Sequence, residues 1–124
     1  MKDITVIIPI HTNENDELNL LQTAINSVKD QQSKPEKLLI VCTEELKSGI
    51  ENLDFGDTNY GIIINNTGSY DFSSQINFGV ENCETEFFCI LELDDELSKL
   101  WIRKVKDYMG YYEDVDVFLP LITN

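Results

Sequence analysis

The chain has 124 residues, of which 42% are hydrophobic and 26% are charged, as expected for one folded globular domain. Its formal net charge of −14, from 23 acidic and 9 basic residues, argues against a nucleic-acid surface and against docking on anionic membranes. An anionic ligand would therefore need a metal ion or helix N-termini to bind here.

Apolar runs of strand length alternate along the chain with segments of helical periodicity. Strands are predicted over 4–10, 38–42, 60–64, 87–91 and 115–122. Helices are predicted over 18–28, 44–50, 72–83 and 97–110. Such alternation calls for a mainly parallel sheet with right-handed crossovers. The predicted fold class is therefore α/β, a three-layer sandwich in a single domain over 1–124.

Acidic residues follow the apolar run 87–91, which is expected to be a strand buried on both faces. They are Glu92, Asp94, Asp95 and Glu96. In open α/β sheets ligands bind beyond the carboxyl ends of the strands, so these carboxylates are expected where such a fold binds ligands. Crowded carboxylates repel one another, and a hard divalent cation would relieve that repulsion. A solvated acidic loop after a core strand is the alternative interpretation.

The three cysteines do not have the spacing of metal ligands. Cys42 and Cys89 lie in apolar runs, which predicts buried and reduced thiols, and an odd number of cysteines does not suggest a disulfide framework. The sequence shows no signal-peptide pattern and no apolar segment of membrane-spanning length. We therefore expect a reducing, cytoplasmic setting and no membrane partner.

Five segments, in this order, resemble motifs of the family-two glycosyltransferases, which have the GT-A fold. They are the strand 4–9, the helix segment 24–31, the loop 66–68, the helix segment 76–80 and the acidic segment 92–95. The last falls where the family carries an Asp-x-Asp-Asp metal motif. The resemblance covers nearly the whole chain. It implies the nucleotide-binding half of GT-A, and we expect the third, second, first and fourth strands to lie in that order across the sheet.

The resemblance implies a nucleotide-diphospho-sugar site at the strand ends, with Mn or Mg on the diphosphate. Carried over residue by residue, it assigns the nucleotide contacts to Pro9, His11, Asn77 and Glu92. It places Glu92 on the ribose side and Asp94 on the metal, with Asp95 in support. A metal there could neutralise the charge that develops as the sugar diphosphate leaves. Alternatively, His11 is a solvated loop residue and Asn77 bonds to its own helix backbone.

Three departures from the family pattern argue against a complete enzyme. Cys42-Thr43 stands where the family usually has an acidic pair near the nucleobase, and Ile76 replaces an arginine. The family also continues past the metal motif with a half that supplies the acceptor site and the catalytic base. We expect this chain not to transfer sugar by itself, and no catalytic residue is predicted. The alternative is a non-catalytic structural or assembly protein, such as a viral or phage particle component located in the virion.

Aromatic residues near the C-terminus are candidates for a partner surface. Tyr111 and Tyr112 follow a glycine and are expected to be exposed, whereas helical spacing places Trp101 and Tyr108 in the core. A last strand over 115–122 would present an unpaired edge, which is a ready pairing site. Protein partners are therefore expected at these two tyrosines and at this strand.

Overall fold

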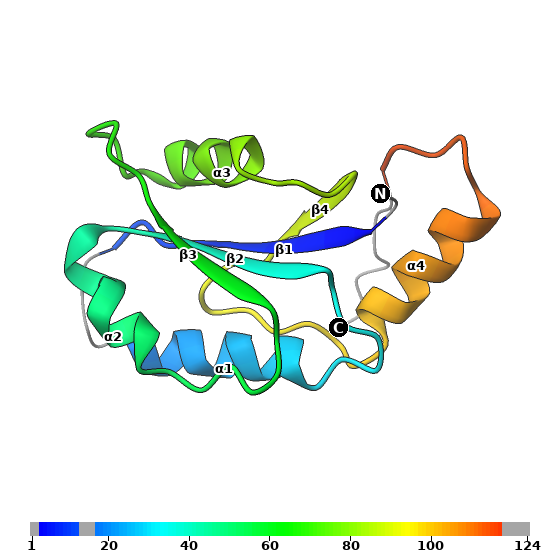
Figure 1. The fold of residues 1–124 in the computed structure, drawn as a ribbon, viewed down its shortest axis with the longest axis horizontal. Coiled ribbons are helices and arrows are strands. Elements are labelled where there is room, and N and C mark those ends of the chain that lie inside the picture. Colours follow the sequence, from blue (N-terminus) through cyan, green and yellow to red (C-terminus); the bar gives the residue numbers. More distant parts are fainter. Residues whose placement is uncertain (1–2, 13–16, 118–124) are drawn as a thin grey trace.

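The computed structural model describes residues 3–12 and 17–117 and contains a four-stranded sheet (Figure 1). Its strands are β1 (Ile4–Pro9), β2 (Lys37–Cys42), β3 (Tyr60–Ile64) and β4 (Phe87–Ile90). They lie in the order β3-β2-β1-β4, and all three neighbouring pairs are parallel. The predicted α/β class and strand order are thus confirmed.

Helices lie on both faces of the sheet. They are α1 (Leu18–Lys29), α2 (Lys47–Glu51), α3 (Phe72–Glu81) and α4 (Trp101–Tyr111), and a short 3-10 helix, η2 (Glu44–Leu46), precedes α2. Figure 1 shows α1 and α3 on opposite faces of the sheet and α4 beside the end where β1 begins. Within the described ranges, no helix is both long and apolar enough to cross a bilayer.

The central strands β1 and β2 are buried on both faces, as their continuous apolar sequences predict. Successive side chains of a strand point to opposite faces, so each strand contributes to two cores. Val6 and Ile8 of β1 join the larger hydrophobic cluster, which includes the apolar stripe of α1. Ile7 joins a smaller cluster with Leu39 and Val41 on the face covered by α3. The sheet is therefore the middle of three layers.

The outer strand β4 is less well covered than its sequence predicts. Within the described residues it pairs only with β1. Leu91, just after the strand, is buried, but the side chain of Phe88 is 45% exposed. The prediction that the run 87–91 is buried on both faces is therefore wrong at Phe88, because a strand with a neighbour on one side has less cover.

Helix α4 begins at Trp101 and not at Leu97, where the apolar spacing predicts its start. The segment between these residues is held by Gln31 at the end of α1. The Gln31 Nε2 group donates a hydrogen bond to the carbonyl of Ser98 (2.6 Å), and its Oε1 accepts one from the backbone N–H of Ile102 (3.0 Å). The second bond satisfies one of the N–H groups that a first helical turn leaves free.

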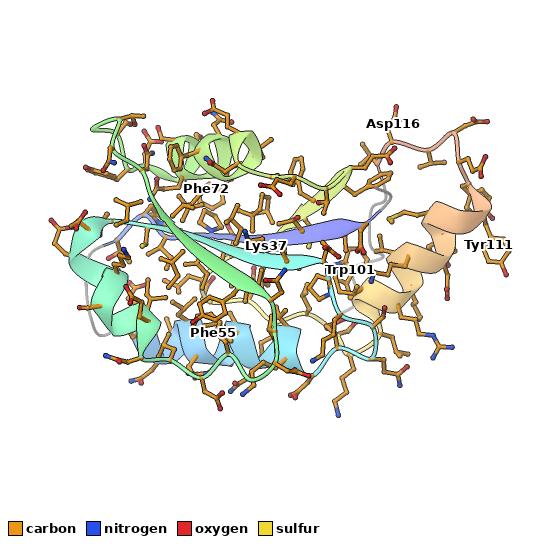
Figure 2. The ribbon with its side chains drawn as sticks, viewed as in Figure 1. Lys37, Phe55, Phe72, Trp101, Tyr111 and Asp116 are labelled. Atoms are coloured by element: carbon orange, nitrogen blue, oxygen red, sulfur yellow. The ribbon has the colours of Figure 1, made fainter. Side chains whose placement is uncertain are left out.

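The aromatic residues of α4 divide between core and solvent. The helix buries the stripe Ile102, Val105 and Met109. Trp101 packs partly against the core, but Tyr108 lies beside the stripe and is 49% exposed, so its predicted core position is wrong. Tyr111 and Tyr112 are 81% and 56% exposed, which confirms the prediction for both. Figure 2 shows Tyr111 at the outer end of α4.

The predicted strand over 115–122 is wrong for its first three residues. Val115 to Val117 have no strand pairing in the structure. The backbone N–H of Val115 instead bonds to the carbonyl of Tyr112 (3.2 Å), which closes a turn after α4. The rest of the predicted strand, 118–122, lies outside the described residues.

Close packing of α3 on the sheet depends on Gly79. A Cβ at this position would lie 2.8 Å from Cγ2 of Ile7 and 3.1 Å from Cγ2 of Val41. We expect Gly79→Ala to lower the free energy of unfolding by about 1–3 kcal/mol because the helix or the strands must shift. Urea denaturation measures this change.

The matched control is Gly110→Ala on α4, where an added Cβ meets nothing within 4 Å. Alanine favours helix over glycine by up to about 1 kcal/mol, so this variant is expected to be as stable as the parent or slightly more stable. Equal stability of the two alanine variants would contradict the packing role of Gly79.

Two shielded thiols give the stability of the fold a pH dependence. Cys42 is buried as predicted, but Cys89 is only partly buried because it lies on the outer strand β4. Burial raises the pKa of Cys42 and of Cys89 from 9.0 to about 11 in each case. The folded state therefore holds these protons more tightly than the unfolded chain, and the resulting stability is present below pH 9 and lost as the pH rises to about 11. We expect a loss of about 2 kcal/mol per thiol across this interval.

Urea denaturation below pH 9 and near pH 11, with Cys42→Ala and Cys89→Ala as references, isolates this contribution. The relevant quantity is the difference between the parent and each variant, because contributions from all other groups are common to the three proteins. Parallel stability profiles for all three proteins would show that the thiols do not contribute.

Candidate functional site

Parallel strands bring their carboxyl ends to one edge of the sheet. Figure 1 shows the segments that follow β1, β2 and β3 at one end of the molecule and α4 at the other. The edge is tied together by backbone hydrogen bonds: the N–H of Ile10 donates to the carbonyl of Val41 (2.8 Å), and that of Asn65 to the carbonyl of Cys42 (3.4 Å). Polar residues after the strands are thus held close together, where open α/β sheets bind ligands.

Three of the predicted acidic residues converge after β4. Glu92, Asp94 and Asp95 are exposed, and each offers a carboxylate oxygen within 4.8 Å of those of the other two. A turn holds them in place, since the N–H of Asp95 donates to the carbonyl of Glu92 (3.0 Å). Glu96 is exposed but does not belong to this acidic cluster of three. An all-oxygen set of this kind fits a hard cation such as Mg²⁺ or Mn²⁺.

The acidic cluster is anchored to the end of β1 by the leucine within it. Leu93 lies between Glu92 and Asp94 and is buried, although both neighbours are exposed. It packs in the main core and lines a small hollow together with Ile10 and Leu46. The alternation of acidic and apolar residues therefore fixes the carboxylates beside the loops that follow β1 and β2.

These loops enclose an open cavity of about 350 Å³. It is lined by His11, Thr12, Thr43, Glu45 and Tyr70, which follow β1, β2 and β3. The exposed His11 ring makes an edge-on contact with the ring of Phe72 at the start of α3, with a centroid distance of 5.7 Å. The cavity thus presents an imidazole, a phenol, hydroxyls and a carboxylate. Its volume is at the low end of the range for small-molecule sites.

Thr43 brings a buried hydroxyl to the wall of this cavity. Its Oγ1 is buried and has no hydrogen-bond partner within the described part of the chain. A buried hydroxyl without a partner costs on the order of 1–3 kcal/mol, which a water molecule or a ligand could recover. In the sequence, Thr43 stands out only as a departure from a family pattern, although its place after β2 is a sufficient signal.

The residues predicted to contact a nucleotide lie in different surroundings. Pro9 is buried at the end of β1, and His11 lines the cavity. Asn77 is exposed on α3, two residues from both Gln75 and Gly79, which face the sheet. It is not among the residues that line the cavity. The structure thus brings His11 to the cavity and Glu92 to the acidic cluster, but it does not bring Asn77 to either.

A buried amide network behind the cavity was missed by the sequence analysis. Gln75 is fully buried; its Nε2 donates to the carbonyl of Ile10 (2.8 Å), and its Oε1 accepts from Nδ2 of Asn65 (2.9 Å). The same Asn65 Nδ2 donates to the carbonyl of Ser69 (3.0 Å), and Asn65 Oδ1 accepts from the N–H of Thr67 (3.0 Å). The signal was a glutamine one helical turn before Gly79, on the helix face that packs on the sheet.

Comparisons with known proteins identify the family and the fold. The sequence model of glycosyl transferase family 2 matches residues 5–122. No curated protein matches the chain. Among solved structures, TarS from S. aureus, residues 1–349, superposes with a TM-score of 0.73 at 19% identity, over 91% of this chain and 33% of that one.

Two ligand complexes of TarS 1–349 from S. aureus are similar as well. The complex with UDP-GlcNAc has a TM-score of 0.71 at 20% identity and covers 91% of this chain and 32% of that one. The complex with UDP has a TM-score of 0.69 at 16% identity, over 91% and 33%. This chain therefore spans about a third of the length of these structures, which share its GT-A fold. Because the family match extends over nearly all of its residues, the chain belongs to glycosyl transferase family 2.

Proposed function

We propose that this chain binds a nucleotide-diphospho-sugar at the carboxyl ends of its strands, through a divalent metal ion. The observation that carries the proposal is the convergence of Glu92, Asp94 and Asp95, whose carboxylate oxygens lie within 4.8 Å of one another, in a protein that also has an open cavity lined by the loops after β1, β2 and β3. Family membership supports it, and so do the similar TarS structures, which were solved with UDP and with UDP-GlcNAc.

The chemistry of the residues suggests which part of the ligand each of them would contact. The nucleobase would occupy the cavity between His11 and Tyr70, whose rings offer flat apolar faces and polar atoms. Glu92 would contact the ribose, while Asp94 and Asp95 would hold the metal. Pro9 would form part of the buried floor and Asn77 would approach from α3, as the family resemblance predicts.

Electrostatics makes the metal necessary to this proposal. The protein carries a net charge of −14, and three carboxylates meet at the site. A diphosphate brought to these carboxylates would be repelled unless a cation lay between them. Such a cation also stabilises the diphosphate as a leaving group. The role of the protein is to hold the cation and orient the nucleotide.

Isothermal titration calorimetry with UDP and with GDP, with and without Mn²⁺, tests the proposal. We expect binding of one or both nucleotides when Mn²⁺ is present and loss of that binding in excess chelator. Equally tight binding in chelator would refute the metal role, and no binding under any condition would refute the proposed function.

We also propose that the 124-residue chain does not transfer sugar by itself. Transfer needs a general base within hydrogen-bond reach of the acceptor hydroxyl. The described acidic residues that follow Glu96 are Asp107, Glu113, Asp114 and Asp116. They lie on α4 or just after it, and Figure 2 shows Asp116 at the end of the molecule opposite the strand tips. Measurable transfer or hydrolysis of a nucleotide sugar by the purified chain, at a metal-dependent rate, would contradict this proposal.

A second candidate function is assembly with other proteins, favoured by the aromatic residues around the end of α4. Tyr108, Tyr111 and Tyr112 are all at least 49% exposed, and Val117 is 69% exposed. Exposed tyrosines are typical of protein interfaces. Sedimentation of the purified chain, alone and with co-expressed neighbours, tests this function. A strictly monomeric chain under all these conditions would exclude it.

A further inference from the structure

We propose that Gln75 is a positioning residue that sets the distance between the two aromatic walls of the cavity. The inference rests on the proposed function, because it takes this cavity as the place of the nucleobase. One wall is His11, in the loop after β1, and the other is Tyr70, in the loop after β3. The two loops are far apart in sequence, and Gln75 bonds to the first directly and to the second through Asn65.

Short chains of hydrogen bonds connect Gln75 to the backbone beside both wall residues. Gln75 Nε2 donates to the carbonyl of Ile10 (2.8 Å), the residue before His11. Gln75 Oε1 accepts from Nδ2 of Asn65 (2.9 Å), which also donates to the carbonyl of Ser69 (3.0 Å), the residue before Tyr70. Each wall residue therefore follows a carbonyl held by the same pair of buried amides.

Only a primary amide of this length can fill both roles. Its NH₂ group donates to one loop while its oxygen accepts from the other. Gln75 is fully buried, so an apolar side chain of similar size would leave the Ile10 carbonyl and one N–H of Asn65 without partners. The loops would then shift to recover hydrogen bonds with water, and the cavity walls would move with them.

A second buried glutamine provides a matched control. Gln31 is 4% exposed and also holds two segments together: its Nε2 donates to the carbonyls of Ser27 (3.0 Å) and Ser98 (2.6 Å), and its Oε1 accepts from the N–H of Ile102 (3.0 Å). It joins α1 to the start of α4, and it does not line the cavity. Its loss should lower stability without changing the cavity.

The test compares Gln75→Met with Gln31→Met. Both variants are expected to have a lowered Tm. In ¹H–¹⁵N spectra without ligand, the amide signals of His11 and Tyr70 should shift in Gln75→Met and stay in place in Gln31→Met. With Mn²⁺ present, the affinity for UDP should fall by about tenfold or more in Gln75→Met and by less than about twofold in Gln31→Met.

Unmoved His11 and Tyr70 signals in Gln75→Met, or equal UDP affinities of the two variants, would overturn the proposal. If the parent protein binds GDP but not UDP, the affinities are compared with GDP. If it binds neither nucleotide, the proposed function fails, and the spectra alone decide whether Gln75 positions the walls. Should Gln75→Met not fold, Asn65→Ala serves in its place. It should shift the Tyr70 signal and leave the His11 signal in place. A shift of both signals, or of neither, would contradict the proposal that Gln75 reaches Tyr70 through Asn65.

Discussion

Replacing Ile7 by alanine is expected to lower the free energy of unfolding by about 2–5 kcal/mol, the largest stability change predicted for a single side chain here. Ile7 is fully buried at the centre of β1, in the small cluster with Leu39 and Val41 beneath α3. Its Cγ2 lies against Gly79, which has no side chain to fill the space that truncation would leave. The cavity would therefore persist, and persisting cavities account for the high end of this range.

Ile90→Ala on β4 is the matched comparison. Ile90 pairs with Ile7 in register and packs against the same cluster, but it is only partly buried because β4 is the outer strand. The same truncation should therefore cost less, about 1–2 kcal/mol. Urea denaturation of both variants measures the difference. A loss below about 1 kcal/mol for Ile7→Ala would show that α3 can close onto the sheet after all.

The contrast between these two isoleucines shows how far sequence determines the fold. Both lie in continuous apolar runs, and on the sequence alone both belong to the core. Runs of β-branched residues separated by helical periodicity were sufficient to predict the strands, and the family resemblance supplied their order. They could not reveal that β4, among the described residues, has a neighbour on one side only, because exposure of an edge depends on which strands pair.

Helix ends were predicted less accurately than strands, for a related reason. The apolar spacing around Leu97 is helical, but Gln31, just after α1, hydrogen-bonds to the carbonyl of Ser98 and to the N–H of Ile102. A long-range hydrogen bond of this kind overrides local propensity and leaves no periodic signal. Tyr108 shows the same limit, since one position along a helix turns a side chain by about 100° and out of the buried stripe.

The candidate site divides into a part that sequence could predict and a part that it could not. Residues adjacent in sequence, such as Asp94 and Asp95, were predicted together because one loop carries them. The cavity between His11 and Tyr70, and the amides of Asn65 and Gln75 behind it, join loops from different strands. These contacts depend on strand order and register, which single-residue patterns do not encode.

The largest functional effect is expected for Asp94→Asn, which should weaken Mn²⁺-dependent binding of UDP by roughly 100-fold, or about 2.8 kcal/mol. An amide keeps the size of the side chain, but it carries no charge and offers one oxygen where the carboxylate has two. The three carboxylates lie within 4.8 Å of one another, so removal of one charge takes away a large share of the attraction for a dication. Asp94 is exposed, and its replacement should leave the stability of the fold unchanged.

The direction in which UDP affinity changes in Asp94→Asn distinguishes a metal ligand from a residue that contributes only to the net charge. If Asp94 acted only through the net charge of −14, its neutralisation would reduce repulsion and strengthen the binding of an anion. Loss of affinity in Mn²⁺, together with unchanged or slightly improved binding in chelator, therefore identifies a ligand of the metal. Asp107→Asn, at an exposed position of α4 outside the acidic cluster, makes the same change in charge and should leave UDP binding unaltered. Calorimetry on the parent and both variants decides the matter, and equal Mn²⁺ dependence in Asp94→Asn and the parent would remove Asp94 from the metal site.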